Sequence, residues 1–455
     1  MLKRFIKRLL GQNSTADETT SPLRRIPLEE HGVRREQISA CALHVTDTLQ
    51  QQGYLAFVVG GAIRDLMIGA RPKDFDVATN ATPEQVRGLF RRAHIIGRRF
   101  RLVHVMCGND TVEVSTFRAH TIESEDGDRT TDTHGRILRD NVFGGQESDA
   151  ERRDFTINAL YYDPQQQEIW DYCGGVSDIR QRLVRMIGDP ATRYREDPVR
   201  MLRCARFAAK LDFHIEPNTR APIAGLAGLL ANVPPARLFD EMLKLLLSGH
   251  AVRAIHQLRA EGLHHGVMPM LDQLLDEQQS QRFVTAALHN TDQRVQAGKP
   301  VSPAFLFASL LWHPLQPIWQ QRLASDENEQ SALFAAMDDV LEQQRSRLAV
   351  PRRLDGNIKE IWAMQPRFLQ RGGGKAWRLV THPRFRAGYD FLLLRAEADH
   401  NLRELADWWT AFYHADDGLR DNLVAALTET TPAKKRRRRK KPSTPPPAEP
   451  DVTHD

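Results

Sequence analysis

The stretch Tyr54–Thr79, YLAFVVGGAIRDLMIGARPKDFDVAT, contains two apolar strand candidates separated by a double glycine and a short helical segment. The first candidate, Tyr54–Val59, ends at Gly60-Gly61, and the second is Phe75–Thr79. Short apolar and β-branched runs bounded by turn residues are typical of strands. This stretch therefore predicts the start of a small domain in which strands and helices alternate.

Downstream, the pattern predicts one more helix and a hairpin. Thr82 is a suitable N-cap for a helix over Pro83–Arg92. Leu102–Met106 and Thr111–Thr116 alternate apolar and polar residues around a Gly-Asn-Asp turn, which indicates two paired strands.

Three acids in this region are candidates for a metal site. Asp74 and Asp76 are two residues apart, so on a strand their side chains point to the same face. Carboxylates this close repel each other, and a hard divalent cation such as Mg²⁺ relieves that repulsion. Glu113, on a neighbouring strand candidate, would supply a third carboxylate. Two metal ions held in this way would activate an attacking hydroxyl and stabilise a leaving pyrophosphate.

The double glycine is a candidate phosphate-binding turn. Glycine lets the backbone approach a phosphate closely, and the start of a helix favours anions. A Gly-Gly turn or an Asp-x-Asp pair alone is weak evidence. The order strand, Gly-Gly, helix, Asp-x-Asp and acidic strand is a much more specific signal.

Two blocks rich in arginine and aspartate follow, at Arg152–Leu160 and Arg193–Phe207. In the second block, Asp197 is a suitable N-cap and Pro198 suits the first helical position. Three arginines then recur every third residue and share one side of the helix: Arg200, Arg203 and Arg206. A solvated face with salt bridges is the alternative, but arginine at all three positions favours recognition of a phosphate or a base edge.

The net charge of +5 is concentrated at the C-terminus. Lys434–Lys441 is an unbroken basic run, and residues 434–455 account for the whole imbalance. Such a block does not pack, so we expect a disordered tail that attracts a polyanion such as nucleic acid. A tail that only improves solubility is the alternative.

Composition limits the class of protein. The chain has 455 residues, of which 41% are hydrophobic, and it has no apolar run long enough to predict a transmembrane helix. Four scattered cysteines argue against a disulfide scaffold and fit a reducing cytoplasm. Residues 1–10 are basic and apolar but lack the features of a secretory signal. We expect a terminal helix there, and contact with a membrane surface stays open.

Strand signals fade beyond about residue 180, and helical patterns replace them. Val199–Leu211, Leu238–Leu247 and Ser331–Leu348 are examples. Trp408 and Trp409, together with Phe412 and Tyr413, have the helical spacing of core residues, although stacking on RNA bases is the alternative. The predicted fold class is α+β, with a small mixed-sheet head, an all-helical second part and a disordered basic tail.

The order of motifs resembles that of the class II nucleotidyltransferases, which comprise tRNA CCA-adding enzymes and bacterial poly(A) polymerases. The segments that show the resemblance are KDFDVATNATPEQVR, GRRFRLVHVM, RRDFTINALYY and RYREDPVRMLRCARFAAKL. Together with the basic tail, they are most similar to the poly(A) polymerase branch. The resemblance is strong over about residues 50–250 and weaker to about residue 415. It implies a five-stranded head followed by a helical neck and body.

The resemblance implies a role for each motif. The catalytic residues would be Asp74, Asp76, Asp154 and Glu113, with Asp74 and Asp76 as metal ligands. Whether Glu113 or Asp154 is the third catalytic carboxylate stays open. The nucleotide-binding residues would be Gly60, Gly61, Arg64 and Asp65 at the triphosphate, Arg153 and Asn158 at the sugar, and Asp197, Arg200, Arg203 and Arg206 at the base. The RNA-binding residues would be Lys434, Lys435, Arg436, Arg437, Arg438, Arg439, Lys440 and Lys441.

The implied reaction is attack of an RNA 3′-hydroxyl on the α-phosphorus of ATP, without a template and with release of pyrophosphate. It needs Mg²⁺ or Mn²⁺, ATP and RNA 3′ ends, and it implies a cytoplasmic role in RNA processing and decay. Proteins of RNA degradation or RNA chaperoning are candidate partners, and the oligomeric state stays open.

The expected domains are a flexible N-terminal extension (1–35), a nucleotidyltransferase head (36–175), a helical neck that recognises the base (176–250), a helical RNA-binding body (251–425) and a disordered basic tail (426–455). Two rival functions remain. A CCA-adding enzyme would use CTP before ATP and stop after three additions. An RNA-binding scaffold with an inactive head would show no turnover, but the intact acids Asp74, Asp76 and Glu113 argue against it.

Overall fold

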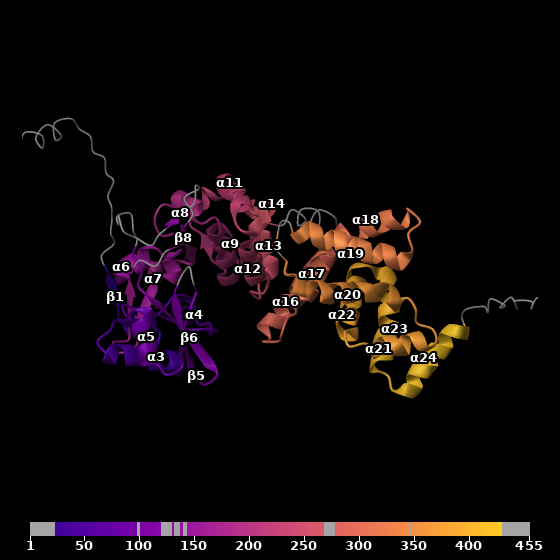
Figure 1. The fold of residues 1–455 in the computed structure, drawn as a ribbon, viewed down its shortest axis with the longest axis horizontal. Helices are drawn as coiled ribbons and strands as arrows, with labels where there is room; N and C mark the ends of the chain where they lie inside the picture. The colour runs from indigo at the N-terminus through magenta and orange to yellow at the C-terminus, as the bar shows by residue number, and fades with distance from the viewer. Residues whose placement is uncertain are drawn as a thin grey trace, which may run out of the picture. The chain divides into compact units, whose positions relative to one another are not determined.

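The computed structural model, drawn in Figure 1, divides into two units, residues 1–357 and 358–455. The structure describes residues 23–97, 101–119, 130–131, 137–139, 143–267, 278–345, 348 and 350–429.

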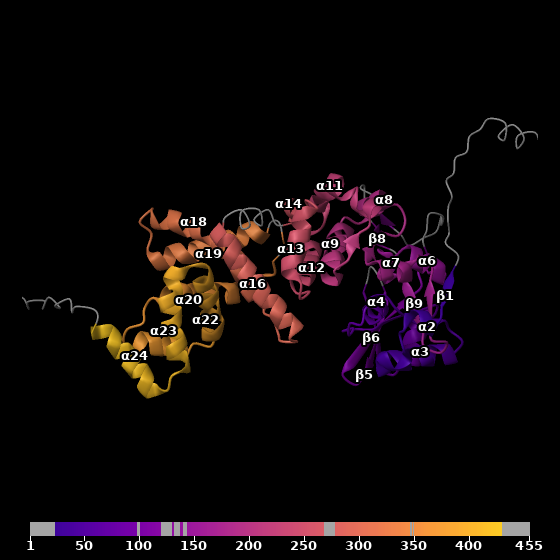
Figure 2. The ribbon, with the colours of Figure 1, turned by 180° about the vertical axis from the view of Figure 1, so that it is seen from behind.

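The first unit contains a mixed sheet, and its described part has eight strands in the order β1-β10-β9-β2-β3-β6-β5-β4. β3 pairs with β6 in parallel, and the other neighbours described in this sheet are antiparallel. β1 and β9 can be followed from behind in Figure 2. The strands are β1 (Arg24–Ile26), β2 (Ala56–Val59), β3 (Asp76–Thr79), β4 (Ala93–Ile96), β5 (Leu102–Cys107), β6 (Asp110–Thr116), β9 (Leu160–Asp163) and β10 (Glu168–Asp171).

Most of the predicted elements of the head are confirmed. β2, β3, β5 and β6 match the strand candidates, and α4 (Gly61–Met67) and α5 (Pro83–Leu89) match the helices. α5 ends at Leu89 rather than at Arg92, because Phe90 is extended and the chain continues into β4.

The sheet is larger than the five strands that the resemblance implied, because β1, β9 and β10 extend it beyond β2. β9 and β10 are four residues each, too short for a clear alternation. β1 lies inside the segment 1–35 that the sequence predicted to be flexible. Its pairing with β10 and the buried side chain of Ile26 order this part of the segment.

Helices α3 (Ala40–Gln51) and α5 cover one face of the sheet, here called the back face. The Ser39 hydroxyl accepts a hydrogen bond from Ala42 N and so caps α3. Thr82 and Gln85 form a reciprocal capping box at the start of α5, which satisfies two backbone N–H groups. Val45 and Leu49 of α3 are fully buried against the strands.

A second apolar layer covers part of the opposite face, here called the front face. Its core cluster joins residues of β2, β3 and β9 with residues of the segment 117–187: Phe57, Val59, Ala78, Phe117, Ala150, Ala159, Tyr161 and Ile187. The helices of this layer are α6 (Gln146–Glu151) and α7 (Gly175–Gln181).

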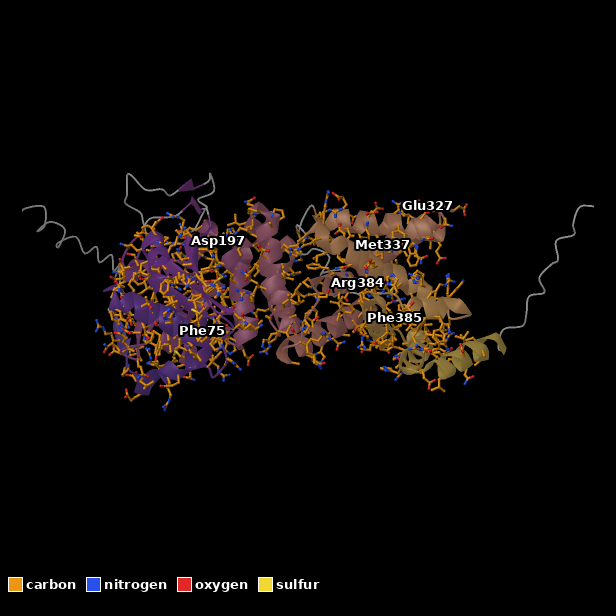
Figure 3. All side chains as sticks on the ribbon, turned by 60° about the horizontal axis from the view of Figure 1, so that its bottom comes forward. Phe75, Asp197, Glu327, Met337, Arg384 and Phe385 are labelled. Carbon is orange, nitrogen blue, oxygen red and sulfur yellow. A yellow bond between two sulfur atoms is a disulfide. The ribbon has the colours of Figure 1, made fainter. Side chains whose placement is uncertain are left out.

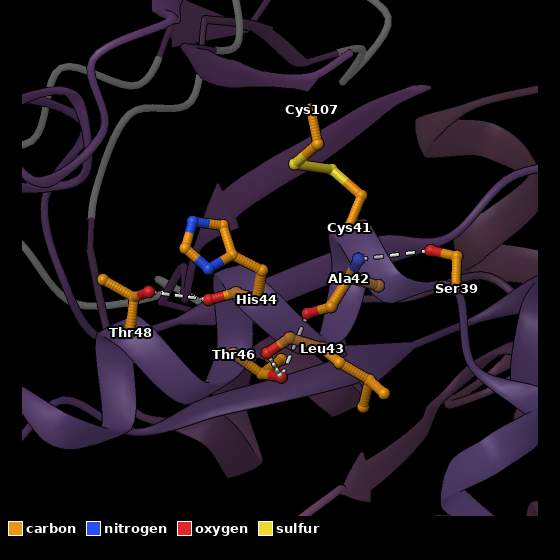
Figure 4. The surroundings of a disulfide bond; sticks show 8 residues. All are labelled: Ser39, Cys41, Ala42, Leu43, His44, Thr46, Thr48 and Cys107. Atoms are coloured by element: carbon orange, nitrogen blue, oxygen red, sulfur yellow. Dashed lines mark hydrogen bonds between the residues drawn. A yellow bond between two sulfur atoms is a disulfide. The ribbon is translucent and has the colours of Figure 1, made fainter. Parts of the chain in front are cut away.

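Cys41 of α3 and Cys107 of β5 form a disulfide bond (Figure 4). The scattered cysteines argued against a disulfide scaffold, and this single bond was not predicted. The two cysteines are 66 residues apart, so their spacing does not reveal that a helix and a strand bring them together. Cys173 and Cys204 are free thiols.

The rest of the first unit is mainly helical, apart from the short parallel pair β11 (Leu183–Val184) and β12 (His214–Ile215). Two further short strands, β7 (Thr130–Thr131) and β8 (Ile137–Arg139), lie between β6 and α6 in the chain. The described helices are α8 (Pro190–Glu196), α9 (Val199–Leu211), α10 (Pro217–Arg220), α11 (Ile223–Leu226), α12 (Pro235–Leu246), α13 (Ala251–Ala260), α14 (His264–Val267), α16 (Gln278–Gln296), α17 (Pro303–Leu310), α18 (Trp312–Leu323) and α19 (Glu329–Arg345).

The second unit is also helical and has an aromatic core. Trp409 is fully buried and its indole N–H donates to Phe368 O at 2.9 Å, so the prediction that it belongs to a core is confirmed. Trp408 is partly buried and packs against this core. The helices are α20 (Asp355–Phe368), which begins just before the boundary, α21 (Gly374–Val380), α22 (Phe385–Ala398), α23 (Arg403–His414) and α24 (Asp417–Glu429).

The predicted α+β class with a helical second part is confirmed. The basic run Lys434–Lys441 and residues 1–10 lie outside the described residues. None of the described helices is both long and apolar enough to cross a lipid bilayer.

Candidate active site

A hollow of about 470 Å³ in the first unit brings together the glycine turn, the first arginine-rich block and helix α9. It collects all the predicted site residues of the head and neck except Asp65, Asp74 and Glu113. Its lining is Gly60, Gly61, Arg64, Asp76, Arg153, Asp154, Asn158, Asp197, Arg200, Arg203, Arg206, Phe207 and Lys210.

The glycine turn forms one wall of this hollow. Gly60 has φ +72°, a conformation that glycine adopts at little cost, and it caps the start of α4. A Cβ atom on Gly61 would lie 3.3 Å from Arg64 Nη2. The turn is therefore a close fit between the backbone and the arginine behind it.

Arg64 and Asp65 have different positions relative to the hollow. The Arg64 guanidinium lines it and donates to Asn158 Oδ1 and, at 2.6 Å from Nη2, to Asp65 Oδ1. Asp65 itself does not line the hollow, and its second oxygen lies 3.5 Å from Lys210 Nζ. Asp65 therefore orients Arg64 rather than facing a ligand directly.

Of the three predicted metal-site acids, Asp76 lines the hollow, and Asp74 and Glu113 do not. Asp76 begins β3 and lies directly opposite Glu113 on the parallel strand β6. Asp74 is exposed just before β3 and borders a second hollow of about 740 Å³, between the α4–β3 loop and the β5–β6 turn. Phe75, between the two aspartates, is labelled in Figure 3.

The environment of Asp76 disfavours its charge. The residue is exposed, but nearby protein atoms displace part of the water around its carboxylate. This partial burial, the Glu113 carboxylate and Asp74 together raise the pKa of Asp76 to about 6, although Arg153 opposes the shift. A cation between these acids would remove the repulsion.

The donor set suits a hard divalent cation but is incomplete. In the described part of the chain, no group of three His, Cys, Asp or Glu side chains is gathered closely enough to hold a metal. Mg²⁺ commonly takes one or two carboxylates and completes its shell with water and substrate phosphates. Two exposed aspartates beside a hollow lined with arginines fit that manner of binding.

Asp154 has the opposite environment. Its Oδ2 accepts from Arg203 Nε at 2.8 Å and Nη2 at 2.6 Å, and its Oδ1 accepts from Asn158 Nδ2 and Phe155 N. Burial opposes ionisation here, but Arg203 and Asn158 outweigh it and hold the pKa of Asp154 well below its usual range. Asp154 is therefore a charged group whose partners are already in place.

Arg153 is held from behind by a buried pair. Its Nη2 donates to Asp149 Oδ2 at 3.1 Å and its Nε donates to Tyr161 Oη at 3.0 Å. The Tyr161 hydroxyl in turn donates to the same Asp149 oxygen at 2.7 Å. This network fixes the guanidinium beneath Gly60 and beside Asp76.

Asp197 and Arg200 lie where α8 ends and α9 begins, and Asp197 is labelled in Figure 3. Asp197 is not the N-cap that the sequence predicted, because the helix starts one residue later behind Pro198. Its side chain instead accepts from Arg237 Nη2 at 3.0 Å through Oδ2. Asp197 Oδ1 has no hydrogen-bond partner among the described residues.

Arg200 is oriented by groups on the preceding helix. Its Nη1 donates to Glu196 Oε2 at 3.0 Å and to Arg193 O at 2.9 Å. Arg193 also donates to Glu196 and, through Nη2, to the carbonyls of Arg152 and Arg153. The two arginine-rich blocks are therefore joined into one structure.

The sequence analysis missed several residues of this site. Phe207 lies under the guanidinium groups of Arg64, Arg203 and Arg206, and Arg206 pairs with Glu241 of α12 at 2.5 Å. The i,i+4 spacing of Glu196 with Arg200 was a usable signal. Arg237 and Glu241 gave none, because they lie on another helix far along the chain.

Comparison with known proteins supports one family over most of the chain. Three family models match: "Poly A polymerase head domain" over residues 56–185, "Probable RNA and SrmB- binding site of polymerase A" over residues 212–275, and "Polymerase A arginine-rich C-terminus" over residues 325–443. The poly(A) polymerase I of Salmonella typhimurium is 48% identical over 397 residues, which is 85% of each chain.

Similarity to CCA-adding enzymes is more limited. The CCA-adding enzyme of Bacillus licheniformis is 36% identical over 237 residues, which is 52% of this chain and 57% of that one. A solved structure of the Thermotoga maritima CCA-adding enzyme with tRNA matches with a TM-score of 0.56 and 16% identity. It covers 91% of this chain and 97% of that one, and at this identity the match concerns the fold alone.

Proposed function

The chain belongs to the bacterial poly(A) polymerase family, and we propose that the hollow described above is where it transfers AMP from ATP to RNA 3′ ends. The protein is a polynucleotide adenylyltransferase that works without a template and releases pyrophosphate. One observation carries the assignment of the site: the glycine turn, the arginines, Asp197 and Asp76 all line one hollow.

The residues divide the work of binding ATP. The Gly60-Gly61 turn, Arg64 and Arg153 face the triphosphate, since the backbone is open there and two guanidinium groups supply positive charge. Asn158, which Arg64 and Asp154 hold in place, faces the sugar. This arrangement positions the α-phosphorus next to Asp76.

The metal chemistry is assigned to the acids on β3, just before it and on the paired strand β6. Asp74 and Asp76 would hold Mg²⁺ or Mn²⁺, and Glu113 would be the third carboxylate. Bound there, such ions lower the pKa of an attacking hydroxyl and stabilise charge on a leaving pyrophosphate. The chain's own contribution is to place the 3′-hydroxyl, the α-phosphorus and the leaving group in line.

Base selection is assigned to Asp197 and Arg200, with Arg203 and Arg206 supporting. The unpartnered Asp197 Oδ1 accepts a hydrogen bond from an exocyclic amino group, and Arg200 donates to the neighbouring ring nitrogen. Guanine and uracil present a carbonyl at the first position, which would face the carboxylate with no hydrogen. A site built on such a pair discriminates strongly against them.

Cytosine presents the same amino group and ring nitrogen as adenine, so these two residues alone admit a CCA-adding enzyme. The comparisons favour adenylation: the match to poly(A) polymerase I is both closer and longer than the match to a CCA-adding enzyme.

We extend the proposal to the remaining parts of the chain. Residues 36–175 form the catalytic head, 176–250 the neck, 251–425 the RNA-binding body, and the basic residues of 426–455 bind RNA through its phosphates. The proposal includes a cytoplasmic location and a role in RNA processing and decay. RNA-degradation and RNA-chaperone proteins are proposed partners.

An incorporation assay tests the function. The full chain is incubated with Mg²⁺, a generic RNA oligonucleotide and each nucleoside triphosphate in turn. A long ladder with ATP alone is expected. One to three additions that need CTP and occur only on tRNA ends would make it a CCA-adding enzyme, and RNA binding without turnover would make it a scaffold.

A further inference from the structure

The front face of the sheet has a covered half and an open half. The apolar layer described above covers β2, β3, β9 and β10. On β4, β5 and β6, the side chains of this face stay partly or fully exposed in the described part of the chain: His94, Ile96, Leu102, His104, Met106, Thr111, Glu113 and Ser115. The alternate residues of the same strands, such as Val103 and Val114, are buried on the back face.

One row of side chains crosses the border between the two halves. The strand register places Val59 opposite Asp76, Asp76 opposite Glu113, Glu113 opposite His104, and His104 opposite His94. Directly opposed residues share a face, and their Cβ atoms lie about 5 Å apart. His104 Nε2 is 3.5 Å from Glu113 Oε2. The imidazole is therefore the next side chain after the catalytic acids on the open half.

The in-line geometry of the reaction indicates which substrate approaches over the open half. The glycine turn follows β2, and Arg153 and Asn158 precede β9, so the triphosphate is held on the covered side of Asp76. Attacking and leaving oxygens lie roughly in line in phosphoryl transfer. The RNA 3′-hydroxyl must then arrive from the other side of Asp76, over β6 and β5.

The hydrogen-bond donors on this face favour the same direction of approach for the RNA. Asp74, Asp76 and Glu113 repel an RNA backbone, so the approaching strand needs hydrogen-bond donors close to the acids. His104 supplies one, and His94 and Arg92 lie farther along the same face of the edge strand β4 and its approach. Half-exposed Leu102 and Met106 add apolar surface on which a base can rest.

We propose that the open face of β4 and β5 receives the 3′-terminal nucleotides of the RNA, and that the His104 imidazole donates a hydrogen bond to the terminal ribose or its 5′-phosphate. The inference rests on the proposed function and adds the subsite for the second substrate. No bond to His104 is made or broken in the reaction.

The first test compares His104→Ala and His104→Gln, since a glutamine amide reaches the position of Nε2 and keeps a donor. The control is His44→Ala, an exposed histidine on α3, which covers the back face of the sheet. Steady-state rates are measured with the RNA oligonucleotide and ATP varied separately. We expect His104→Ala to raise KM for RNA about ten-fold and leave KM for ATP within two-fold, the loss of one hydrogen bond to a charged strand.

His104→Gln should recover most of the RNA affinity, and His44→Ala should match the wild type. An unchanged KM for RNA in His104→Ala would overturn the proposal. So would a fall in kcat without a change in KM for RNA, because that pattern means His104 only orients Glu113.

A measurement on the wild-type protein is independent of any folding defect in a variant. RNA ending in 4-thiouridine is cross-linked with ultraviolet light, and the labelled peptide is identified by mass spectrometry. We expect the label within residues 92–107, and a label confined to other segments would overturn the proposal. A wild-type protein that adds no AMP would contradict the proposed function instead, so the two failures are distinguishable.

Discussion

Asp76 and Asp154 line the same hollow but have opposite environments. Asp76 faces two other carboxylates, and its pKa is raised to about 6 by partial burial and by Glu113. Asp154 is more deeply buried, yet its pKa is lowered, because Arg203 and Asn158 outweigh the burial. Arg153 only partly offsets the negative charges around Asp76, whereas Asp154 forms a direct ion pair with Arg203.

This difference indicates what each acid is for. An acid that is costly to ionise in the free protein gains most from a cation that arrives with the substrate. An acid with a bidentate arginine has little left to offer a metal and serves to hold Arg203 and Asn158. We therefore infer that Glu113, the direct neighbour of Asp76, is the third catalytic carboxylate, and that Asp154 is a positioning residue.

The largest expected effect comes from Asp76→Asn. The amide keeps the shape but loses the charge that holds the metal, so kcat should fall by about 10³-fold or more. Initial rates of AMP incorporation measure this, and filter binding should show RNA affinity within two-fold of the wild type. Activity within ten-fold of the wild type would remove Asp76 from the metal site.

Asp154→Asn should have a smaller effect on rate and a larger one on stability. It leaves Arg203 without its partner, and breaking such a pair costs about 2 kcal/mol when one side chain is partly exposed. We expect kcat to fall about 10²-fold. Urea unfolding with paired rate measurements checks both values. Full stability with activity as low as that of Asp76→Asn would reverse the comparison.

The two acids should also differ in their response to pH. At limiting Mg²⁺, the rate should fall about ten-fold from pH 7 to pH 5, because protonated Asp76 does not hold the cation. Asp154 stays ionised throughout this window because its pKa is lowered. Raising the Mg²⁺ concentration should move the fall to lower pH, since metal and proton compete. A flat profile between pH 5 and 7 would contradict the assignment.

The smallest effect concerns stability without metal. The folded-state pKa of Asp76 lies above its unfolded value of 3.8, so its ionisation destabilises the fold as pH rises through this range. Asp76→Asn should therefore be more stable than the wild type at pH 8, by about 1 kcal/mol after solvent screening. At pH 3.5 the two should be equal. Urea unfolding in the presence of a chelator measures this, and a less stable variant at pH 8 would exclude it.

Local patterns in the sequence predicted most of the head. The double glycine between β2 and α4, the Thr82 cap and the β5–β6 hairpin all follow from neighbours within a few residues. The three-residue spacing placed Arg200, Arg203 and Arg206 on one side of α9, and all three line the hollow. These features depend only on local chain geometry, so they can be predicted from the sequence alone.

What the sequence did not predict depends on partners far along the chain. Asp197 was predicted to cap a helix, but its side chain instead accepts a hydrogen bond from Arg237, forty positions later on α12. The resemblance placed Asp65 at the triphosphate, but its carboxylate interacts with Arg64 and Lys210 instead. His104 had no local signal, because only the strand register shows that it lies beside Glu113.

The disulfide between Cys41 and Cys107 has a consequence for the unfolded chain. It closes a loop of 66 residues that contains the glycine turn and both Asp74 and Asp76, but not Glu113 or Arg153. In the chain-entropy description, closing a loop of this length lowers the conformational entropy of the denatured ensemble. This loss stabilises the folded state by about 4 kcal/mol. A thiol reductant in the buffer would therefore lower the denaturant concentration at which the head unfolds.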